Sequence, residues 1–282
     1  MSDFLALMAR NSEGRAAEAR QRENLSALRR RALAMPNCPQ LELHRGCFDI
    51  IAEVKRHAPS VGALRPAAAG DPDFVGRQAE AYVLGGAVAI SVLTEPEAFH
   101  GALEDITAAA RAVPIPIMRK DFLVDPYQVI EARAAGAAGV LLILRMLDDS
   151  HLGEMLDAAG ELGLFVILEA FDQDDLARAR QVTSATDDEA VRVLVGLNSR
   201  NLATLEVDDE RLARLAKAFP DGLPRVAESG LETPADVARV AALGYSLALV
   251  GTALMKASNP TKLTADMIEA GRIATMKQCA SA

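Results

Sequence analysis

The stretch of sequence that decides the fold runs from residue 115 to residue 169 and reads IPIMRKDFLVDPYQVIEARAAGAAGVLLILRMLDDSHLGEMLDAAGELGLFVILE. Three short apolar runs alternate in it with two amphipathic segments of helical length. Polar residues do not alternate with apolar ones inside the runs, which is typical of strands that are covered on both faces. Parallel strands separated by helices produce that arrangement, so the stretch predicts successive β-α units.

The same rhythm holds from about residue 48 onwards. Eight apolar runs predict strands at 49–54, 87–93, 115–118, 139–144, 164–168, 192–197, 224–227 and 247–250. Helices are predicted to follow them at 72–84, 103–112, 126–135, 150–162, 173–180, 209–219, 234–243 and 260–272. Asp71, Asp125 and Thr233 each precede a proline, and a capping residue followed by proline is typical of the start of a helix.

Eight β-α units within roughly 230 residues favour an α/β fold of the (β/α)8 TIM-barrel type. The main alternative is an open doubly wound sheet of the dinucleotide-binding kind, in which a Gly-x-Gly-x-x-Gly motif follows a strand, and this sequence shows none. Residues 1–47 have helical character and precede the repeat, so we expect an N-terminal helical extension and a barrel over residues 48–275. No Pro/Gly/Ser-rich linker divides the chain, and residues 1–282 are therefore expected to form one domain.

The composition limits the classes of protein to consider. Half of the 282 residues are hydrophobic, which fits a globular protein with one large core and argues against intrinsic disorder. No apolar run approaches the roughly 20 residues of a membrane-spanning helix, so no membrane partner is expected. A net charge of −9 and the absence of Trp argue against nucleic acid as a partner, because such surfaces need basic and stacking side chains.

Targeting and cysteine usage favour a cytoplasmic protein. The N-terminal arginines alternate with glutamates, which predicts a solvated helix face rather than a transit peptide, and no apolar signal segment is present. Cys38, Cys47 and Cys279 lack the spacing of a disulfide framework or a zinc site. No His/Asp/Glu cluster indicates a metal and no nucleophile elbow is found, so we expect no metal.

Polar side chains gather at the predicted strand ends. In a barrel of this type the C-terminal ends of the strands form the active site. Six charged or amide side chains lie there: Glu53, Lys55, Lys120, Glu169, Asn198 and Glu228. Bringing them together costs desolvation energy unless they pair or bind a charged ligand. We therefore predict one site at this end of the barrel, with none of the four histidines as a catalytic residue.

The last two predicted strands indicate what anion the site binds. Ser229-Gly230 and Gly251-Thr252 follow them, and we expect these residues to lie at the N-termini of neighbouring helices. Free backbone N–H groups and the helix dipole make such positions suitable for phosphate. The alternative is ordinary β-α turn chemistry.

Five stretches of the sequence resemble indole-3-glycerol phosphate synthase. They are IAEVKR at 51–56 with Pro59-Ser60, ISVLTEP at 90–96, RKDF at 119–122 with DPYQ at 125–128, GLNSRNL at 196–202, and ESG at 228–230. The similarity spans residues 49 to 258, with its motifs in order along the predicted strands. It implies a (β/α)8 barrel with an N-terminal helical extension and a cofactor-free step of tryptophan biosynthesis. That step closes 1-(2-carboxyphenylamino)-1-deoxyribulose 5-phosphate to indole-3-glycerol phosphate, with loss of CO2 and water.

The resemblance also implies roles for the strand-end residues. Lys120 would be the general acid that protonates the ketone oxygen, and we expect a desolvated or cation-rich surrounding to lower its pKa. Lys55 would bind the carboxylate and assist departure of the hydroxyl. Glu169 would stabilise positive charge on the anilino nitrogen. Glu53, paired with Lys55, would be the base in the dehydration.

Further residues are implied in substrate binding. Asn198 and Glu228 would orient the sugar hydroxyls, with Arg200 supporting them. The residues expected to bind the phosphate end are Ser60, Ser229, Gly230, Gly251 and Thr252. The residues expected to form an apolar wall for the anthranilate ring are Phe99, Phe122 and Leu141.

The loop after the first strand departs from the pattern Lys-x-x-Ser-Pro-Ser-Lys-Gly, because Ala58 and Val61 replace a serine and a lysine. A paralogue that serves a secondary pathway is therefore an alternative, as is a phosphosugar isomerase. The isomerase chemistry uses a Cys/Asp pair at strand ends, where this chain has no cysteine. The expected partner is a small phosphorylated substrate, and the expected oligomeric state is a monomer or a homodimer.

Overall fold

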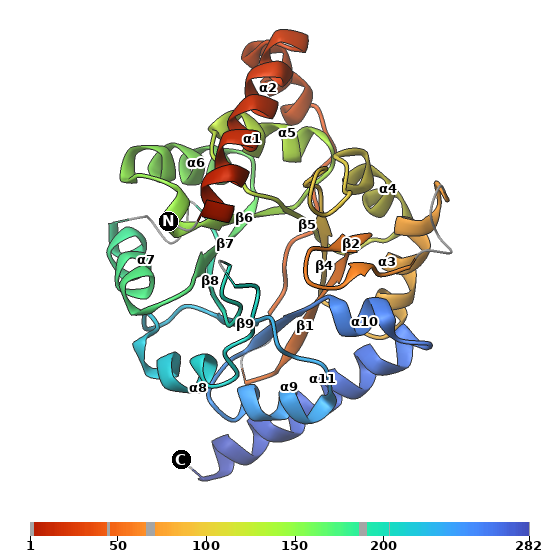
Figure 1. The fold of residues 1–282 in the computed structure, drawn as a ribbon, viewed down its shortest axis with the longest axis vertical. Helices are drawn as coiled ribbons and strands as arrows, with labels where there is room; N and C mark the ends of the chain where they lie inside the picture. Colours follow the sequence, from red (N-terminus) through yellow and green to blue (C-terminus); the bar gives the residue numbers. More distant parts are fainter. Residues whose placement is uncertain (1–2, 44–45, 66–70, 186–190, 203, 282) are drawn as a thin grey trace.

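The computed structural model describes residues 3–43, 46–65, 71–185, 191–202 and 204–281. Eight parallel strands form a closed barrel in the order β1-β10-β9-β8-β7-β6-β5-β4 (Figure 1). The strands are β1 (Asp49–Val54), β4 (Ala89–Leu93), β5 (Ile117–Lys120), β6 (Gly139–Ile143), β7 (Phe165–Ala170), β8 (Val193–Asn198), β9 (Arg225–Glu228) and β10 (Leu247–Val250). The predicted TIM barrel is confirmed, and no predicted strand end is wrong by more than two residues.

Helices surround the barrel (Figure 1). They are α3 (Phe74–Leu84), α4 (Glu104–Ala112), α5 (Pro126–Ala134), α6 (Asp149–Glu161), α7 (Gln173–Ala185), α8 (Arg211–Leu215), α9 (Pro234–Ala241) and α11 (Pro260–Ser281). Each predicted helix is present, but α8 gives way to a 3-10 turn, η3 (Ala216–Ala218). Phe219, the residue before Pro220, has an extended backbone, because a residue before a proline avoids the helical conformation, and the helical segment ends before it.

Two of the three predicted helix starts are correct. The side chain of Asp125 accepts the backbone N–H of Tyr127, and Thr233 forms a capping box with Asp236. The prediction at Asp71 is wrong, because α3 begins at Phe74. The Asp71 carboxylate instead accepts the backbone N–H of Asp73 in the turn that precedes the helix.

The N-terminal extension is helical, as predicted, and consists of α1 (Asp3–Arg22) and α2 (Leu25–Leu33). In Figure 1 α1 lies beside β6 and α5, and it contacts α5 and the 3-10 turn η2 (Leu144–Met146). Tyr127 of α5 donates its hydroxyl to the backbone carbonyls of Ala19 (3.0 Å) and Glu23 (2.8 Å). These bonds attach the C-terminal end of α1 to α5.

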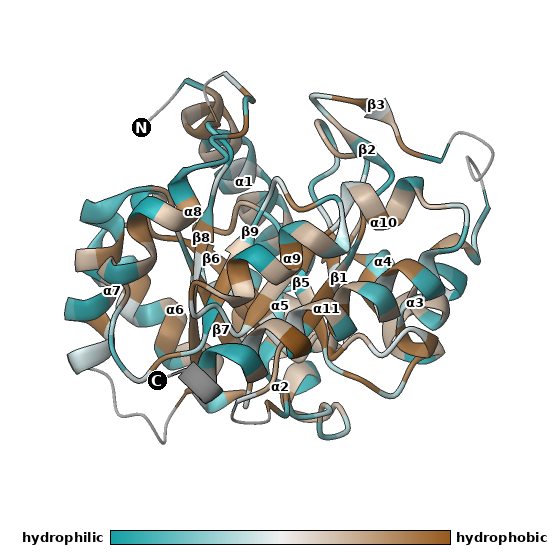
Figure 2. Cartoon of the chain, turned by 90° about the horizontal axis from the view of Figure 1, so that it is seen from below, coloured by the Kyte–Doolittle hydropathy of each residue, from teal (hydrophilic) through white to brown (hydrophobic). Residues whose placement is uncertain are grey.

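Two short elements at the mouth were not predicted. The loop after β1 contains an antiparallel hairpin of β2 (His57–Ala58) and β3 (Gly62–Ala63), and β10 is followed by α10 (Thr252–Lys256). Elements this short carry too few residues for a periodic pattern. In Figure 2 the hairpin and the start of α1 rise on the same side of the barrel.

The core has two parts, because successive strand residues point to opposite faces of the sheet. Ile51, Leu141 and Ile167 belong to the cluster inside the barrel, whereas Ile50 and Leu142 pack against the helices. Both faces of the strands are therefore apolar, which explains the uninterrupted apolar runs in the sequence. Over the described residues, no helix has the length and apolar character needed to cross a membrane.

Candidate active site

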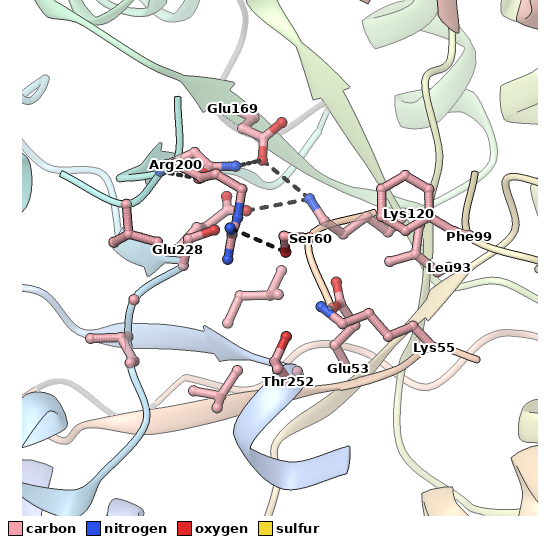
Figure 3. Close-up of a pocket in the computed structure, with 18 of the residues that line it drawn as sticks. Glu53, Lys55, Ser60, Leu93, Phe99, Lys120, Glu169, Arg200, Glu228 and Thr252 are labelled. Atoms are coloured by element: carbon pink, nitrogen blue, oxygen red, sulfur yellow. Dashed lines mark hydrogen bonds and ion pairs between the residues drawn. The ribbon is translucent and has the colours of Figure 1, made fainter. Parts of the chain in front are cut away.

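A cavity of about 340 Å³ opens at the C-terminal ends of the strands, and each of the eight strands contributes to its lining (Figure 3). This volume lies within the range of small-molecule sites. All fifteen residues that the sequence predicted for the site line it: Glu53, Lys55, Ser60, Phe99, Lys120, Phe122, Leu141, Glu169, Asn198, Arg200, Glu228, Ser229, Gly230, Gly251 and Thr252. The predicted residues are therefore brought together at one place.

Lys120 is held between two carboxylates. Its Nζ lies 3.1 Å from Oε1 of Glu169 and 3.4 Å from Oε2 of Glu228. Dashed lines in Figure 3 mark both contacts. Glu169 Oε1 also accepts a hydrogen bond from Nδ2 of Asn198 at 2.9 Å. Both glutamate side chains are only 2% exposed. Ends of β5, β7, β8 and β9 thereby form one buried polar cluster.

A second pair lies at the end of β1. Nζ of Lys55 is 2.6 Å from Oε1 of Glu53, and the glutamate side chain is 3% exposed. Gly251 at the end of β10 makes room for this pair. A Cβ at Gly251 would lie 2.2 Å from Glu53 Oε1 and 2.9 Å from Lys55 Nζ, so any larger residue would displace the pair.

The expectation that the pKa of Lys120 is lowered is wrong. Burial acts to lower this pKa, but the carboxylates of Glu169, Glu228 and Glu53 outweigh it, and the net shift is upward. The mouth is desolvated, as expected, but the charges that act on this ammonium are those of carboxylates. Lys120 is therefore protonated at neutral pH, which is the state that a proton donor needs.

In the same cluster the neutral form of Glu228 is favoured, whereas Lys120 is favoured in its charged form. Burial and the neighbouring Glu169 raise the pKa of Glu228 well above its ordinary value, although Lys120 acts to lower it. Its Oε1 is buried and has no hydrogen-bond partner among the residues that the structure describes. A Cβ at Gly196 would lie 2.0 Å from this oxygen. The carboxyl group is thus packed closely against β8.

The predicted apolar wall is present. The rings of Phe99 and Phe122 lie 6.1 Å apart between centroids, and Leu141 is fully buried beside the cavity. Phe4 of α1 packs edge-on against Phe122 with a centroid distance of 5.8 Å. Phe4 was not predicted for the site, and it reaches the wall from the N-terminal extension.

The residues predicted to bind phosphate at the ends of β9 and β10 also line the cavity. The helix predicted to follow Ser229 and Gly230 begins at Pro234, as expected, and the two residues lie in the loop that precedes it. Both residues have left-handed backbone angles, with φ of 67° and 70°. Gly251 precedes α10, so its neighbour Thr252 is the first residue of that helix.

Arg200 lies between these residues and the polar cluster (Figure 3). Its guanidinium donates to the carbonyl of Leu205 at 2.6 Å and to Oγ of Ser60 at 3.5 Å. No carboxylate in the described part of the chain forms an ion pair with it, and burial lowers its pKa. A half-buried cation without a carboxylate partner is suited to an anionic ligand.

A family model for indole-3-glycerol phosphate synthase matches residues 7–267. The chain belongs to this family. The indole-3-glycerol phosphate synthase of Parafrankia sp. (strain EAN1pec) is 42% identical over 255 residues, which cover 89% of this chain and 90% of the relative. That of Mycobacterium avium (strain 104) is 41% identical over 266 residues, or 92% of both chains.

Solved structures support the fold. The 3-hexulose-6-phosphate synthase from Salmonella typhimurium matches with a TM-score of 0.61 and 17% identity, over 82% of this chain and all of that one. Thiamine phosphate pyrophosphorylase from Pyrococcus furiosus matches with a TM-score of 0.53 and 16% identity, over 81% and 97% of the two chains. At this identity the likeness concerns the barrel alone.

The structure also locates residues that differ from the indole-3-glycerol phosphate synthase pattern or were not predicted. Val61 is 42% exposed and lines the cavity, whereas Ala58 is buried in β2. Lys256 of α10 also lines the cavity and was not predicted. Its position four residues after Thr252, on the same face of a helix, is the sequence feature that could have indicated it. His57 stacks on His100 outside the lining, with 4.4 Å between ring centroids.

Proposed function

We propose that this chain converts 1-(2-carboxyphenylamino)-1-deoxyribulose 5-phosphate to indole-3-glycerol phosphate, with loss of CO2 and water, in tryptophan biosynthesis. The observation that carries the proposal is the ammonium of Lys120, held at the barrel mouth by Glu169 and Glu228. An apolar wall of Phe99 and Phe122 lines the same cavity. Family membership supports the reaction independently of this geometry.

In the first step the ring carbon that bears the carboxylate attacks the ketone carbon of the sugar. The new carbon–carbon bond leaves charge on the ketone oxygen, which takes a proton from the ammonium of Lys120. The anilino nitrogen becomes positive as it supplies electrons to the ring, and the carboxylate of Glu169 stabilises that charge. A positioned proton donor of this kind contributes about 10² to 10⁴ in rate.

The second and third steps belong to Lys55 and Glu53. Lys55 binds the substrate carboxylate until the carbon–carbon bond to it breaks, and CO2 leaves while its electron pair returns to the ring. The hydroxyl formed in the first step then departs as water with a proton from Lys55, and Glu53 removes the proton that completes the indole. Their contact of 2.6 Å allows a proton to pass between them.

The remaining residues hold the substrate. Asn198 and Glu228 orient the sugar hydroxyls, and Arg200 supports Asn198 through a backbone N–H bond of 2.8 Å to its Oδ1. The left-handed backbone at Ser229 and Gly230 and the start of α10 at Thr252 receive the phosphate, with Ser60 and Gly251 beside them.

An assay of indole product fluorescence tests the proposal. The chain should convert the substrate, and Lys120→Ala should lose about 10² to 10⁴ in kcat while inorganic phosphate still binds. Turnover of Lys120→Ala at the rate of the unchanged chain would contradict the assignment of the general acid. Absence of indole product from the unchanged chain would contradict the function itself.

We propose further that residues 1–282 act as one domain, in the cytoplasm, with no cofactor. The alternatives for the oligomeric state are a monomer and a homodimer, which light scattering of the purified chain distinguishes.

A further inference from the structure

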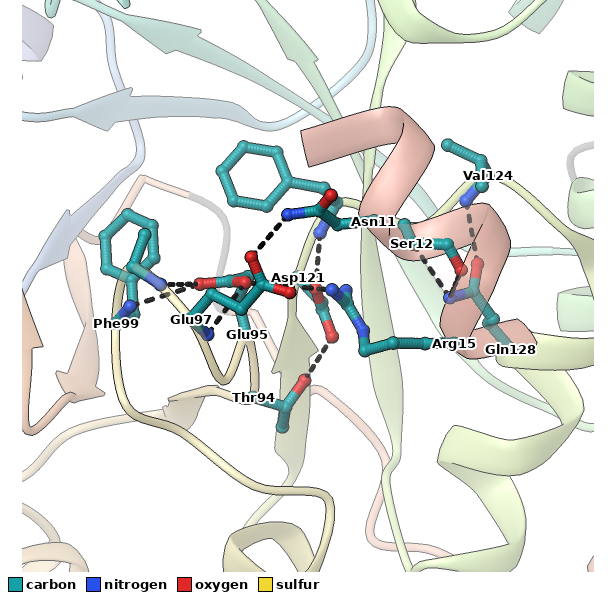
Figure 4. A network of polar contacts seen from close by, with 12 residues as sticks. Asn11, Ser12, Arg15, Thr94, Glu95, Glu97, Phe99, Asp121, Val124 and Gln128 are labelled. Atoms are coloured by element: carbon teal, nitrogen blue, oxygen red, sulfur yellow. Dashed lines mark hydrogen bonds and ion pairs between the residues drawn. The ribbon is translucent and has the colours of Figure 1, made fainter. Parts of the chain in front are cut away.

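A buried polar network lies behind the apolar wall (Figure 4). Its first member is Glu95, in the loop between β4 and α4, with a side chain that is 0% exposed. Its carboxylate accepts the backbone N–H groups of Glu97 (3.0 Å), Ala98 (2.7 Å) and Phe99 (3.1 Å). One carboxylate therefore fixes the loop that carries Phe99, a residue of the cavity wall.

The second member is Asp121, which follows Lys120 directly and is 1% exposed. Its carboxylate accepts the backbone N–H of Phe122 at 2.8 Å and the hydroxyl of Thr94 at 2.8 Å. Arg119 adds a contact of 3.2 Å to the same carboxylate. Asp121 thus fixes the other aromatic residue of the wall.

Arg15 of α1 connects the two carboxylates. Its guanidinium lies 2.7 Å from Oδ1 of Asp121 and 3.7 Å from Oε1 of Glu95, as Figure 4 shows for the hydrogen-bonded contacts. Asp121 has a second cation in Arg119, but within the described ranges Arg15 is the one cation that pairs with Glu95. Loss of Arg15 would remove the cation that balances this buried carboxylate and leave only the three backbone N–H groups to stabilise it, so we expect the loop to shift.

We infer that Arg15 is a positioning residue for the aromatic ring of the substrate. It acts through Glu95 and Asp121 on Phe99 and Phe122, and it touches no cavity surface itself. The N-terminal extension thereby sets the ring-binding half of the site, while the phosphate half is built from β8, β9 and β10 without it. This inference rests on the proposed function for the identity of the ring.

Arg20 provides a matched control on the same helix. It pairs with Asp125 at 2.7 Å and lies over the ring of Tyr127, so it also attaches α1 to the barrel. Neither Asp125 nor Tyr127 lines the cavity. Replacement of Arg20 therefore removes a comparable attachment of α1, at the far end of the loop that carries Phe122, but no contact with Glu95 or Asp121.

The experiment compares Arg15→Met, Arg15→Lys and Arg20→Met in the full chain. Binding of anthranilate probes the ring half of the site, and binding of inorganic phosphate probes the other half. Arg15→Met should weaken anthranilate binding and raise KM for the substrate by about tenfold, short of the roughly 10² that a displacement of about 1 Å costs. Phosphate affinity of Arg15→Met should stay within about twofold of that of the unchanged chain. The anthranilate affinity of Arg15→Lys should lie between those of the unchanged chain and Arg15→Met. Arg20→Met should bind both ligands as the unchanged chain does.

Two results would overturn the inference. One is an equal loss of anthranilate and phosphate binding in Arg15→Met, and the other is the same anthranilate loss in Arg20→Met, since either means that α1 acts through general stability. If Arg15→Met does not fold, Arg15→Lys against Arg20→Lys supplies the same comparison. Both binding measurements are independent of turnover, so failure of the unchanged chain to form indole product would count against the proposed function and not against the role of Arg15.

Discussion

Gly251→Ala offers a sharp test of the pair at the end of β1. The substitution adds one methyl group at a residue whose backbone φ, −123°, lies outside the left-handed region. The methyl carbon would lie 2.2 Å from Oε1 of Glu53. An ordinary carbon–oxygen contact is about 3.3 Å or more, so the two atoms must separate by about 1 Å.

The size of the effect follows from that displacement. A misplacement of about 1 Å in a reacting group costs about 10² in rate. Expressed as activation free energy, this is about 2.7 kcal/mol. Because Glu53 and Lys55 move together, the loss should appear in kcat, while KM changes less if the phosphate end is undisturbed.

Steady-state fluorescence of the indole product measures both constants. Gly153→Ala is the control, because its Cβ would meet nothing within 4 Å in α6 and alanine favours a helix by roughly 0.5–1 kcal/mol. We expect the control to keep its kcat and to unfold at a slightly higher temperature. A kcat of Gly251→Ala within about threefold of the unchanged chain would refute the reasoning that this pair needs its present position.

Three further predictions concern the same cavity. Gly196→Ala drives a methyl group to 2.0 Å from Oε1 of Glu228, so kcat should fall by about 10², with circular dichroism as the check on folding. Glu228→Gln should stabilise the free protein at pH 7, since the raised pKa means that ionisation of this buried group opposes folding. That gain in the free energy of unfolding should vanish as the pH falls below about 4.3, where the carboxyl is protonated in both the folded and the unfolded chain. Urea unfolding across this range measures it, and a gain that grew at low pH would contradict the upward direction of the pKa shift. Val61→Lys adds a cation to the exposed rim of the cavity and should lower KM by about twofold at low ionic strength, an effect that must disappear at high salt if it is electrostatic.

The sequence was sufficient to predict the barrel and to select residues that line one cavity. Runs such as Gly139–Ile143 are apolar on both faces because helices cover one side and the barrel interior the other, and this state leaves a pattern that can be read directly. Since every strand ends at the same mouth, a polar residue at a strand end is placed by topology alone. Lys120 and Glu228 could therefore be assigned to one site although 108 residues separate them.

The environment of each group could not be predicted in the same way. The sign of the Lys120 pKa shift depends on distances of 3.1 and 3.4 Å to two carboxylates, and position along the chain does not determine such distances. The contact of Arg15 with Asp121 joins segments 106 residues apart, and no periodicity marks it. Short elements such as α10 were missed because they consist of a single turn.

The contact between Lys55 and Glu53 has a consequence for the direction of the reaction. In the empty site Lys55 pairs with the carboxylate of Glu53, and the carboxylate of the substrate must compete with Glu53 for it. On the proposed chemistry the substrate carboxylate leaves as uncharged CO2, and Glu53 can then pair with Lys55 again without competition. The reaction itself thus restores the ion pair of the empty site. The product lacks the carboxylate through which the substrate bound Lys55, which favours its release.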